Sequence, residues 1–443
     1  MAPTLTAGLL ERIFKQPIKD FQVQAGCKEG ENVGGSVHTI VATTKSGEKI
    51  TAFFKTFPAK DNPHYQRIKE SQIFRIEADV YSKLVPAIQN LIKACNNSTY
   101  CLPLPKLYAS FHNDEDDYLC LEDVRPEGYK MPNVFIGLTY PECCLAIQEL
   151  ARFHAFTHAL IRVQGEKIFA PSGQFNRLFS RFDGPDIQMW FNLLENSVRV
   201  AVEVLKTVNP KLSEQLNGEI PPGTAAGIWK QIVDRTDDTL FPCIVHGDFW
   251  CNNFLIKYDN KINGQDVSEQ NPEQIKFVDF QHTRRGNIFE DLMYFLLTST
   301  TPEFRQKYLH RVLSDYYAAF KNALDWIQCP LPICFSQGYL MDHFCRLTRP
   351  ALVHMCFAIP LQLGNPTRVY AQMKEADEAV DRNGTPPEGH SENGTNQDSE
   401  KVGFDPDLEA KKFAAGLHAM FASSQFAMQR LESLVKEILS YNN

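Results

Sequence analysis

The sequence has no excess of positive charge. Its 45 Lys and Arg residues are outnumbered by 53 Asp and Glu residues, which gives the 443-residue chain a formal net charge of -8. A protein that binds nucleic acid gains affinity by neutralising phosphates with clustered Lys and Arg. Because the sequence has neither this excess nor a basic run, we expect no nucleic-acid partner.

Long apolar runs are also absent. No stretch approaches the ~20 apolar residues that a helix needs to span a bilayer, and Met1 to Arg12 lacks the basic segment and apolar core of a secretion signal. The hydrophobic fraction of 43% and the charged fraction of 22% are those of an ordinary globular protein. We therefore expect a cytoplasmic protein with no membrane span, built from two or three domains or from two lobes around one cleft.

The twelve cysteines never form a CxxC pair. A disulfide scaffold is typical of short secreted chains, and a zinc site needs ligands at close, regular spacing. Neither pattern is present, so the sequence favours reduced and mostly buried thiols.

Strands and one helix are predicted in the first part of the chain. Ser36 to Thr44 and Lys49 to Phe57 are β-rich runs around a turn that contains Gly, which predicts a hairpin. Ser71 to Leu84 has a helical pattern, and we expect Pro86 to end that helix. Tyr118 to Glu122 is predicted as a further strand.

The remainder is mainly helical, with one return to strands, so the predicted fold class is α+β. A capping box with Pro in the first turn, residues 139–142, opens a helix to about Leu160. Phe254 to Tyr258 and Ile275 to Phe280 are predicted to form one antiparallel hairpin with a long polar tip. Residues 381–403 have too little apolar surface to repay ordering, which predicts a disordered insertion. Later helices are expected at Glu290 to Thr298, Pro302 to Leu324, Gln337 to Phe357 and Pro406 to Tyr441.

The strongest chemical signal is HGDFWCNN at residues 246–253, in a loop between apolar strands. Asp248 can accept a proton from an attacking hydroxyl, and Asn253 offers an amide oxygen to a metal ion. Asp279 ends an otherwise apolar run, which is unfavourable unless the carboxylate meets a cation. The hairpin brings Asn253 beside Asp279, and such oxygen ligands suit Mg²⁺. A hydrogen-bonded structural turn is the alternative.

A second signal pairs Lys55 with Glu77. Strand alternation places Lys55 on one face with Phe53 and Phe57, and helical spacing places Glu77 on the apolar stripe of its helix. An ion pair that positions the amine on a nucleotide phosphate explains both placements. The alternative is a solvated Glu at a helix edge with an unrelated Lys.

Four glycines lie in residues 26–36, just before the first clear strand. Glycines let the backbone approach phosphates and donate N–H groups to them. The spacing matches neither GxGxxG nor a Walker loop, so a plain flexible turn explains it equally well.

Together these motifs resemble the ecdysteroid kinase-like group of arthropod proteins, whose choline-kinase-like domain belongs to the protein-kinase-like fold. The resemblance covers roughly residues 20 to 350 and rests on GENVGGS, FFKTF, FRIEADVYSKLVP, LCLEDV, LARFHA, VHGDFWCNN and IKFVDFQ, in this order. It implies a small β-rich N-lobe over residues 1–122, a large helical C-lobe over residues 123–443, and ATP at the hinge between them.

The resemblance also implies roles for five residues in phosphoryl transfer. By matching position, Lys55 contacts the α- and β-phosphates of ATP and Glu77 holds Lys55. Asp248 is the catalytic base, and Asn253 and Asp279 bind Mg²⁺.

Five further residues match the nucleotide-binding positions of the family. Gly30, Asn32 and Ser36 belong to the loop that covers the phosphates. Glu122 and Asp123 match the hinge, whose backbone faces the adenine.

Three polar residues near these motifs are expected to be structural. His246 braces its loop, because Asp248 already suits the role of base. Asp291 is expected to brace the structure or to place a charge at a helix start. His154 is expected to be a packed, hydrogen-bonded core residue.

The sequence and the resemblance predict an ATP- and Mg²⁺-dependent kinase for an alcohol on a small molecule, with an ecdysteroid or a similarly hydrophobic alcohol as acceptor. Two alternatives remain open. One is a pseudokinase that binds a nucleotide or ligand and acts through interaction. The other is a choline- or aminoglycoside-type kinase, whose cationic substrate needs an anionic or aromatic site.

Overall fold

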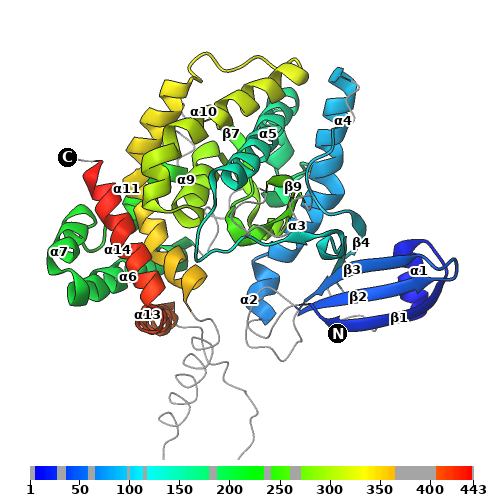
Figure 1. Cartoon of the computed structure of the whole chain (residues 1–443), viewed down its shortest axis with the longest axis horizontal. Helices are drawn as coiled ribbons and strands as arrows, with labels where there is room; N and C mark the ends of the chain where they lie inside the picture. The colour runs from blue at the N-terminus through cyan, green and yellow to red at the C-terminus, as the bar shows by residue number, and fades with distance from the viewer. Residues whose placement is uncertain are drawn as a thin grey trace, which may run out of the picture. The chain divides into compact units, whose positions relative to one another are not determined.

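The described residues form two compact units. The computed structural model describes residues 5–26, 36–57, 65–96, 100–112, 117–178, 187–233, 241–259, 271–364 and 406–441 (Figure 1). The first unit comprises Met1–Arg181 and Gln231–Ala351, and the second comprises Phe182–Lys230 and Leu352–Asn443. The predicted insertion at residues 381–403 lies outside the described residues. The predicted lobe boundary after residue 122 stays a prediction.

The first unit contains a five-stranded antiparallel sheet with the order β1-β2-β3-β5-β4. Figure 1 shows β1, β2 and β3 side by side. Its strands are β1 (Ile18–Ala25), β2 (Ser36–Thr44), β3 (Lys49–Thr56), β4 (Leu107–Phe111) and β5 (Tyr118–Glu122). The predicted β2–β3 hairpin and the predicted strand β5 are confirmed. Strand β1 is not among the predicted strands, although Phe21, Val23 and Ala25 alternate with polar residues. Only one of its eight residues is buried, so it lacks the buried apolar face of a core strand.

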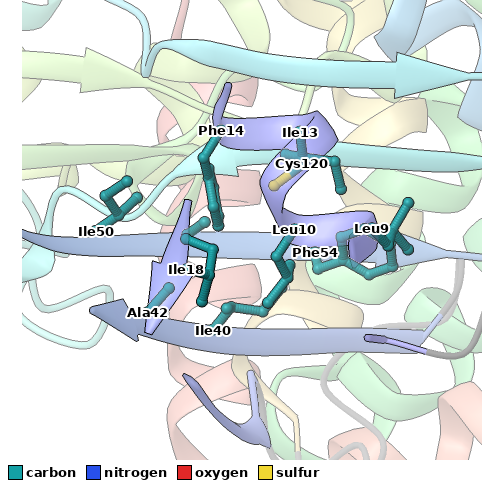
Figure 2. Close-up of a cluster of buried hydrophobic side chains, with 11 residues drawn as sticks. Leu9, Leu10, Ile13, Phe14, Ile18, Ile40, Ala42, Ile50, Phe54 and Cys120 are labelled. Carbon is teal, nitrogen blue, oxygen red and sulfur yellow. The ribbon is translucent and has the colours of Figure 1, made fainter. Parts of the chain in front are cut away.

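Helix α1 (Ala7–Phe14) packs on one face of this sheet. Thr6 caps the helix by accepting a hydrogen bond from the backbone N–H of Leu9. The buried cluster between helix and sheet is shown in Figure 2 and contains Leu9, Leu10, Ile13, Phe14, Ile18, Ile40, Ala42, Ile50, Ala52, Phe54 and Cys120. Since Ile50, Ala52 and Phe54 of β3 face this core, alternation turns Phe53 and Lys55 to the opposite face, as predicted.

Pro86 does not end its helix, which corrects the prediction. After α2 (Tyr65–Glu70), the helical run has three consecutive parts, α3 (Ile73–Asp79), the π-helical turn η1 (Val80–Leu84) and α4 (Val85–Asn96). The backbone N–H of Val85 bonds to the oxygen of Val80, five residues back. Pro86 therefore sits at the start of a new α-helical segment, where its missing N–H costs little.

A second set of strands carries the predicted loop. In the first unit, β7 (Pro242–Val245) pairs with β10 (Arg284–Asn287). A three-stranded sheet has the order β6-β8-β9, with β6 (Tyr129–Lys130), β8 (Phe254–Tyr258) and β9 (Pro272–Phe277). The predicted antiparallel β8–β9 hairpin is confirmed, with Phe254 opposite Phe277. The strand ends at Phe277 and not at Phe280, because the chain turns at Asp279.

Helices make up most of the rest. They are α5 (Tyr140–Gln164), α6 (Ile187–Val208), α7 (Pro210–Glu219), α8 (Ala225–Val233), α9 (Ile288–Ser299), α10 (Pro302–Trp326), α11 (Gln337–Leu363), α13 (Pro406–Ser423) and α14 (Gln425–Ser440). The capping box at Thr139 and Glu142 is present as predicted. The single helix predicted from Pro406 to Tyr441 is wrong, because Ser424 is extended and caps α14 with its side chain.

Short helical turns connect several elements, namely η2 (Arg125–Glu127), η3 (Glu166–Phe169), η4 (Asn176–Leu178), η6 (Cys251–Asn253) and η8 (Phe280–His282). With the β-rich first part and the largely helical remainder, the predicted α+β fold class is confirmed. No helix in the described part of the chain is long and apolar enough to span a bilayer.

The described cysteines are free thiols, as predicted. They are less buried than expected. Cys120, Cys143, Cys243, Cys251 and Cys356 are buried, and the other described cysteines are half-buried or exposed.

Candidate functional site

Lys55 and Glu77 form a close ion pair. The Lys55 Nζ lies 2.9 Å from Oε1 and 3.0 Å from Oε2 of Glu77. The Glu77 side chain is only 3% exposed, and such a buried carboxylate requires a partner. The predicted pairing is therefore present, and it joins helix α3 to the face of β3 that is turned away from α1.

Asp279 extends this pair into a triad of charges. Its Oδ1 lies 3.7 Å from the Lys55 Nζ. Burial works against the charged amine, but the charges of Glu77 and Asp279 outweigh it and hold the pKa of Lys55 well above its usual range. Lys55 is therefore a permanent cation beside two carboxylates.

The backbone at Asp279 adopts an unusual conformation. Its φ of 65° lies in the left-handed region that residues with a Cβ rarely adopt. Just before it, the Val278 N–H bonds to the oxygen of Asn253 at 2.9 Å. Just after it, the Phe280 backbone hydrogen-bonds to the Glu77 carboxylate. The turn thus holds Asp279 between Val278, which is bonded to Asn253, and Phe280, which is bonded to Glu77.

The loop at residues 246–253 follows strand β7 and is held by Asp291 at the start of α9. The two Asp291 carboxylate oxygens accept hydrogen bonds from the backbone N–H groups of His246, at 2.7 Å, and Gly247, at 2.8 Å. His154 from α5 supports Asp291 with its Nε2, 3.0 Å away. The predicted bracing role of Asp291 and the buried, hydrogen-bonded state of His154 are confirmed.

His246 also braces the loop, as predicted. It is fully buried, its Nε2 lies 3.0 Å from the Val278 oxygen, and its ring lies 4.6 Å from the ring of Phe280. These contacts join the 246–253 loop to the segment that carries Asp279.

Asp248 and Asn253 are in direct contact within this loop. The Asn253 Nδ2 donates to the backbone oxygen of Asp248 at 2.7 Å and to its carboxylate at 2.8 Å. Tyr294 from α9 also donates a hydrogen bond to this carboxylate. Burial, with the charge of Asp279 second, raises the pKa of Asp248 to about 7. No sequence pattern singles out Tyr294, because its helix has the apolar composition of an ordinary buried helix.

The oxygen atoms at this site fit a divalent cation. Because the Asn253 nitrogen is used by Asp248, its amide oxygen is the atom that it would offer to a metal. Asp279 would supply the carboxylate, and Mg²⁺ accepts such a small protein set when substrate phosphates and waters complete its shell. The described residues contain no group of three or more His, Cys, Asp or Glu side chains suited to a metal ion. The implied Mg²⁺ site does not need such a group, because substrate phosphates and waters would complete the shell.

The predicted hinge residues are held by local contacts. The backbone N–H of Asp123 donates to the backbone oxygen of Thr51 at 3.1 Å. The Thr51 hydroxyl donates to the backbone oxygen of Asp123 at 3.2 Å. The Asp123 carboxylate binds Arg125, whose guanidinium also lies 4.3 Å from the ring centre of Phe53. The Glu122 N–H donates to the Lys106 oxygen. The adenine-facing role of Glu122 and Asp123 stays a prediction.

The phosphate-covering loop is described only at its end. Ser36 begins β2, where it pairs with Thr56. Gly30 and Asn32 lie outside the described residues. The structure thus brings together Lys55, Glu77, Asp248, Asn253 and Asp279, whose catalytic roles stay predictions.

Comparisons with known proteins agree with the resemblance seen in the sequence. The family model described as ecdysteroid kinase-like matches residues 29–329, which is most of the chain. A search of curated proteins finds no match.

Two solved structures are similar over much of the chain. One, from Thermobifida fusca YX-ER1, is provisionally described as a fructosamine-3-kinase. It shares 13% identity and a TM-score of 0.34 over 79% of this chain and 90% of its own. The other, an amicoumacin kinase in complex with AMP-PNP, Ca²⁺ and Ami, shares 11% identity and a TM-score of 0.36, over 93% of this chain and 92% of its own. At this level of similarity, neither structure informs the roles of individual residues here.

Proposed function

Because the chain belongs to the ecdysteroid kinase-like family, we propose that it is a small-molecule kinase that transfers the γ-phosphate of ATP to an alcohol. The observation that carries the proposal is the convergence of Lys55, Glu77 and Asp279, with Asp248 and Asn253 on the neighbouring loop. Phosphoryl transfer needs little covalent chemistry from the protein, so positioned charges are the machinery that it requires.

Each side chain has a chemical task in this proposal. Lys55, held by Glu77, places a positive charge on the nucleotide phosphates. Asp248 accepts the proton of the acceptor hydroxyl, and its pKa near 7 is suited to proton transfer at neutral pH. Asn253 and Asp279 would hold Mg²⁺, which neutralises charge on the γ-phosphate when bound. Tyr294 and Asn253 orient the Asp248 carboxylate toward the hydroxyl.

The proposed acceptor is an ecdysteroid or a similarly hydrophobic alcohol, and this choice rests on the family. We propose a cytoplasmic location, which the free thiols of the described cysteines favour because reduced thiols persist in that compartment. The phosphate-covering role of Gly30, Asn32 and Ser36 and the adenine contacts of Glu122 and Asp123 belong to the same proposal.

Substitution of the base tests the reaction. Purified protein is incubated with Mg-ATP and a panel of ecdysteroids, sterols, choline and xenobiotic alcohols, and products are detected by mass spectrometry as phosphate adducts. We expect Asp248→Asn to lower kcat by at least about 100-fold, because a positioned general base contributes roughly that much. Binding of AMP-PNP with Mg²⁺ should remain measurable. Asp325→Asn, an exposed change in α10, is the matched control and should keep full activity.

Two results would contradict the proposal. If Asp248→Asn turned over like the unaltered protein, Asp248 would not be the base. If the unaltered protein bound Mg-AMP-PNP but consumed no ATP with any alcohol, the pseudokinase alternative would replace the kinase. Phosphorylation of choline alone would favour the choline-type alternative.

A further inference from the structure

Tyr81 lies next to the site. It belongs to the FRIEADVYSKLVP motif, but the sequence assigns it no role and the proposed reaction does not use it. It belongs to the π-helical turn η1, four residues after Glu77. Its ring meets the ring of Phe280 edge-on, with centroids 5.8 Å apart and an interplanar angle of 86°. Since Phe280 directly follows Asp279, Tyr81 packs against the segment that positions the proposed metal ligand.

The hydroxyl of Tyr81 is buried without a hydrogen-bond partner in the described part of the chain. The residue is only 4% exposed. Leaving a buried hydroxyl unpaired is unfavourable, and most buried tyrosines avoid this by forming a hydrogen bond. Tyr316 does so by bonding to His154, and the half-buried Tyr258 donates to Glu142. The unpaired Tyr81 hydroxyl is therefore an exception that needs an explanation.

The surroundings of this hydroxyl are anionic. Burial first, and then the charges of Glu77 and Asp279, raise the pKa of Tyr81 well above its usual range. The group is therefore a neutral O–H near two carboxylates. A cation with its water shell is the chemical species that two carboxylates attract and that an unpaired hydroxyl can hydrogen-bond.

We propose that the Tyr81 hydroxyl is a positioning group of the metal site, where it hydrogen-bonds to a water ligand of the divalent cation held by Asp279. Mg²⁺ keeps several of its waters when it binds to proteins, and hydrogen bonds to such outer groups orient the metal and its ligands. The inference rests on the proposed function, because that function requires the cation. In the absence of the cation the hydroxyl has no hydrogen-bond partner and only lowers the stability of the folded protein.

This account predicts opposite effects for one substitution in two states of the protein. Tyr81→Phe keeps the ring and its contact with Phe280 but removes the hydroxyl. Without metal, the melting temperature should stay the same or rise, because an unpaired buried polar group is removed. With AMP-PNP present, the Kd for Mg²⁺, measured by isothermal titration calorimetry, should rise about tenfold, which is the lower end of the loss expected when an outer hydrogen bond to a metal ligand is removed.

Tyr258→Phe is the matched control. It also removes a tyrosine hydroxyl from the first unit, but this hydroxyl is paired with Glu142. We expect a lower melting temperature without metal and an unchanged Kd for Mg²⁺. A purely structural role of Tyr81 would give the same pattern as this control.

The possible outcomes separate the inference from the proposed function. An unchanged Mg²⁺ affinity in Tyr81→Phe overturns the inference alone, and so does a loss of stability without metal as large as that of Tyr258→Phe. If the unaltered protein binds no Mg²⁺ with AMP-PNP, both the inference and the proposed function fail. If Mg²⁺ affinity falls tenfold in Tyr81→Phe while no alcohol is phosphorylated by the unaltered protein, the inference holds and the proposed function fails.

Discussion

Gly247 has a backbone conformation and a location that together exclude a larger residue. Its φ is 83°, and an added Cβ would lie 2.1 Å from the His282 carbonyl oxygen and 2.4 Å from the Arg284 guanidinium. The carbonyl belongs to the backbone of η8, next to the segment with Asp279. The loop with Asp248 and the turn with Asp279 can therefore approach closely only because position 247 has no side chain.

We predict that Gly247→Ala disturbs the site more than strain alone explains. Gly128→Ala is the matched control, because Gly128 has a similar φ of 94° with open space around its Cβ position. The control should lose about 1 kcal/mol of unfolding free energy through backbone strain. Gly247→Ala should lose at least about twice as much and most of its AMP-PNP affinity, as measured by urea unfolding and calorimetry. Equal losses in the two variants would show that the close approach at Gly247 is unimportant.

At the scale of elements, the helical run from α3 to α4 determines where Glu77 lies. Asp79 in α3 is nearly fully buried, and each of its two carboxylate oxygens forms an ion pair with a basic side chain. Lys83, one turn later, lies 2.9 Å from Oδ1, and Arg177 of η4 lies 2.9 Å from Oδ2. Arg177 is distant in sequence from Asp79, so their ion pair connects α3 to η4 within the first unit. This connection lies only two residues after Glu77.

We predict a measurable coupling between Asp79 and Arg177. We use a double-mutant cycle of Asp79→Asn and Arg177→Met, measured by urea unfolding. The effects of two substitutions in one ion-pair network on the free energy of unfolding are not additive, and we expect a coupling energy of about 1 kcal/mol because the partial exposure of Arg177 weakens the pair. A cycle of Asp79→Asn with Lys83→Met compares a local pair with the distant one. Additive effects of Asp79→Asn and Arg177→Met would mean that this ion pair does not hold α3.

At the scale of the whole molecule, the described site residues belong to one compact unit. Lys55, Glu77, Asp248, Asn253 and Asp279 lie in the first unit, although the chain of the second unit interrupts them between residues 182 and 230. The β-sheet and the 246–253 loop are thus parts of one folded body. We therefore expect the proposed cation and nucleotide to contact this unit.

Hydrogen exchange tests this assignment. We expect AMP-PNP with Mg²⁺ to slow exchange in β3, α3 and residues 246–253, because ligand binding stabilises the elements that contact it. Peptides from α6, α7 and α14 in the second unit should exchange at unchanged rates. Protection mainly in the second unit would place the nucleotide elsewhere, and AMP-PNP without Mg²⁺ should give weaker protection around Asp279.

Local patterns were sufficient for the pairs that define the site. Strand alternation placed Lys55 on the same face of β3 as Phe53, and helical spacing placed Glu77 on the stripe that meets it. Hairpin pairing brought Asn253 to the segment that leads to Asp279. Each of these inferences uses a period of two or about 3.6 residues, which the order of apolar residues already contains.

Contacts between distant segments could not be obtained in this way. The π-turn that lets the helix continue past Pro86 is not contained in the helical period, and the partners Tyr294 and Arg177 come from chain segments that no local period relates. The unpaired hydroxyl of Tyr81 is of the same kind. Amino-acid order thus specified the residue types and their faces, whereas only tertiary packing decided which buried groups of the described residues meet a hydrogen-bond partner and which do not.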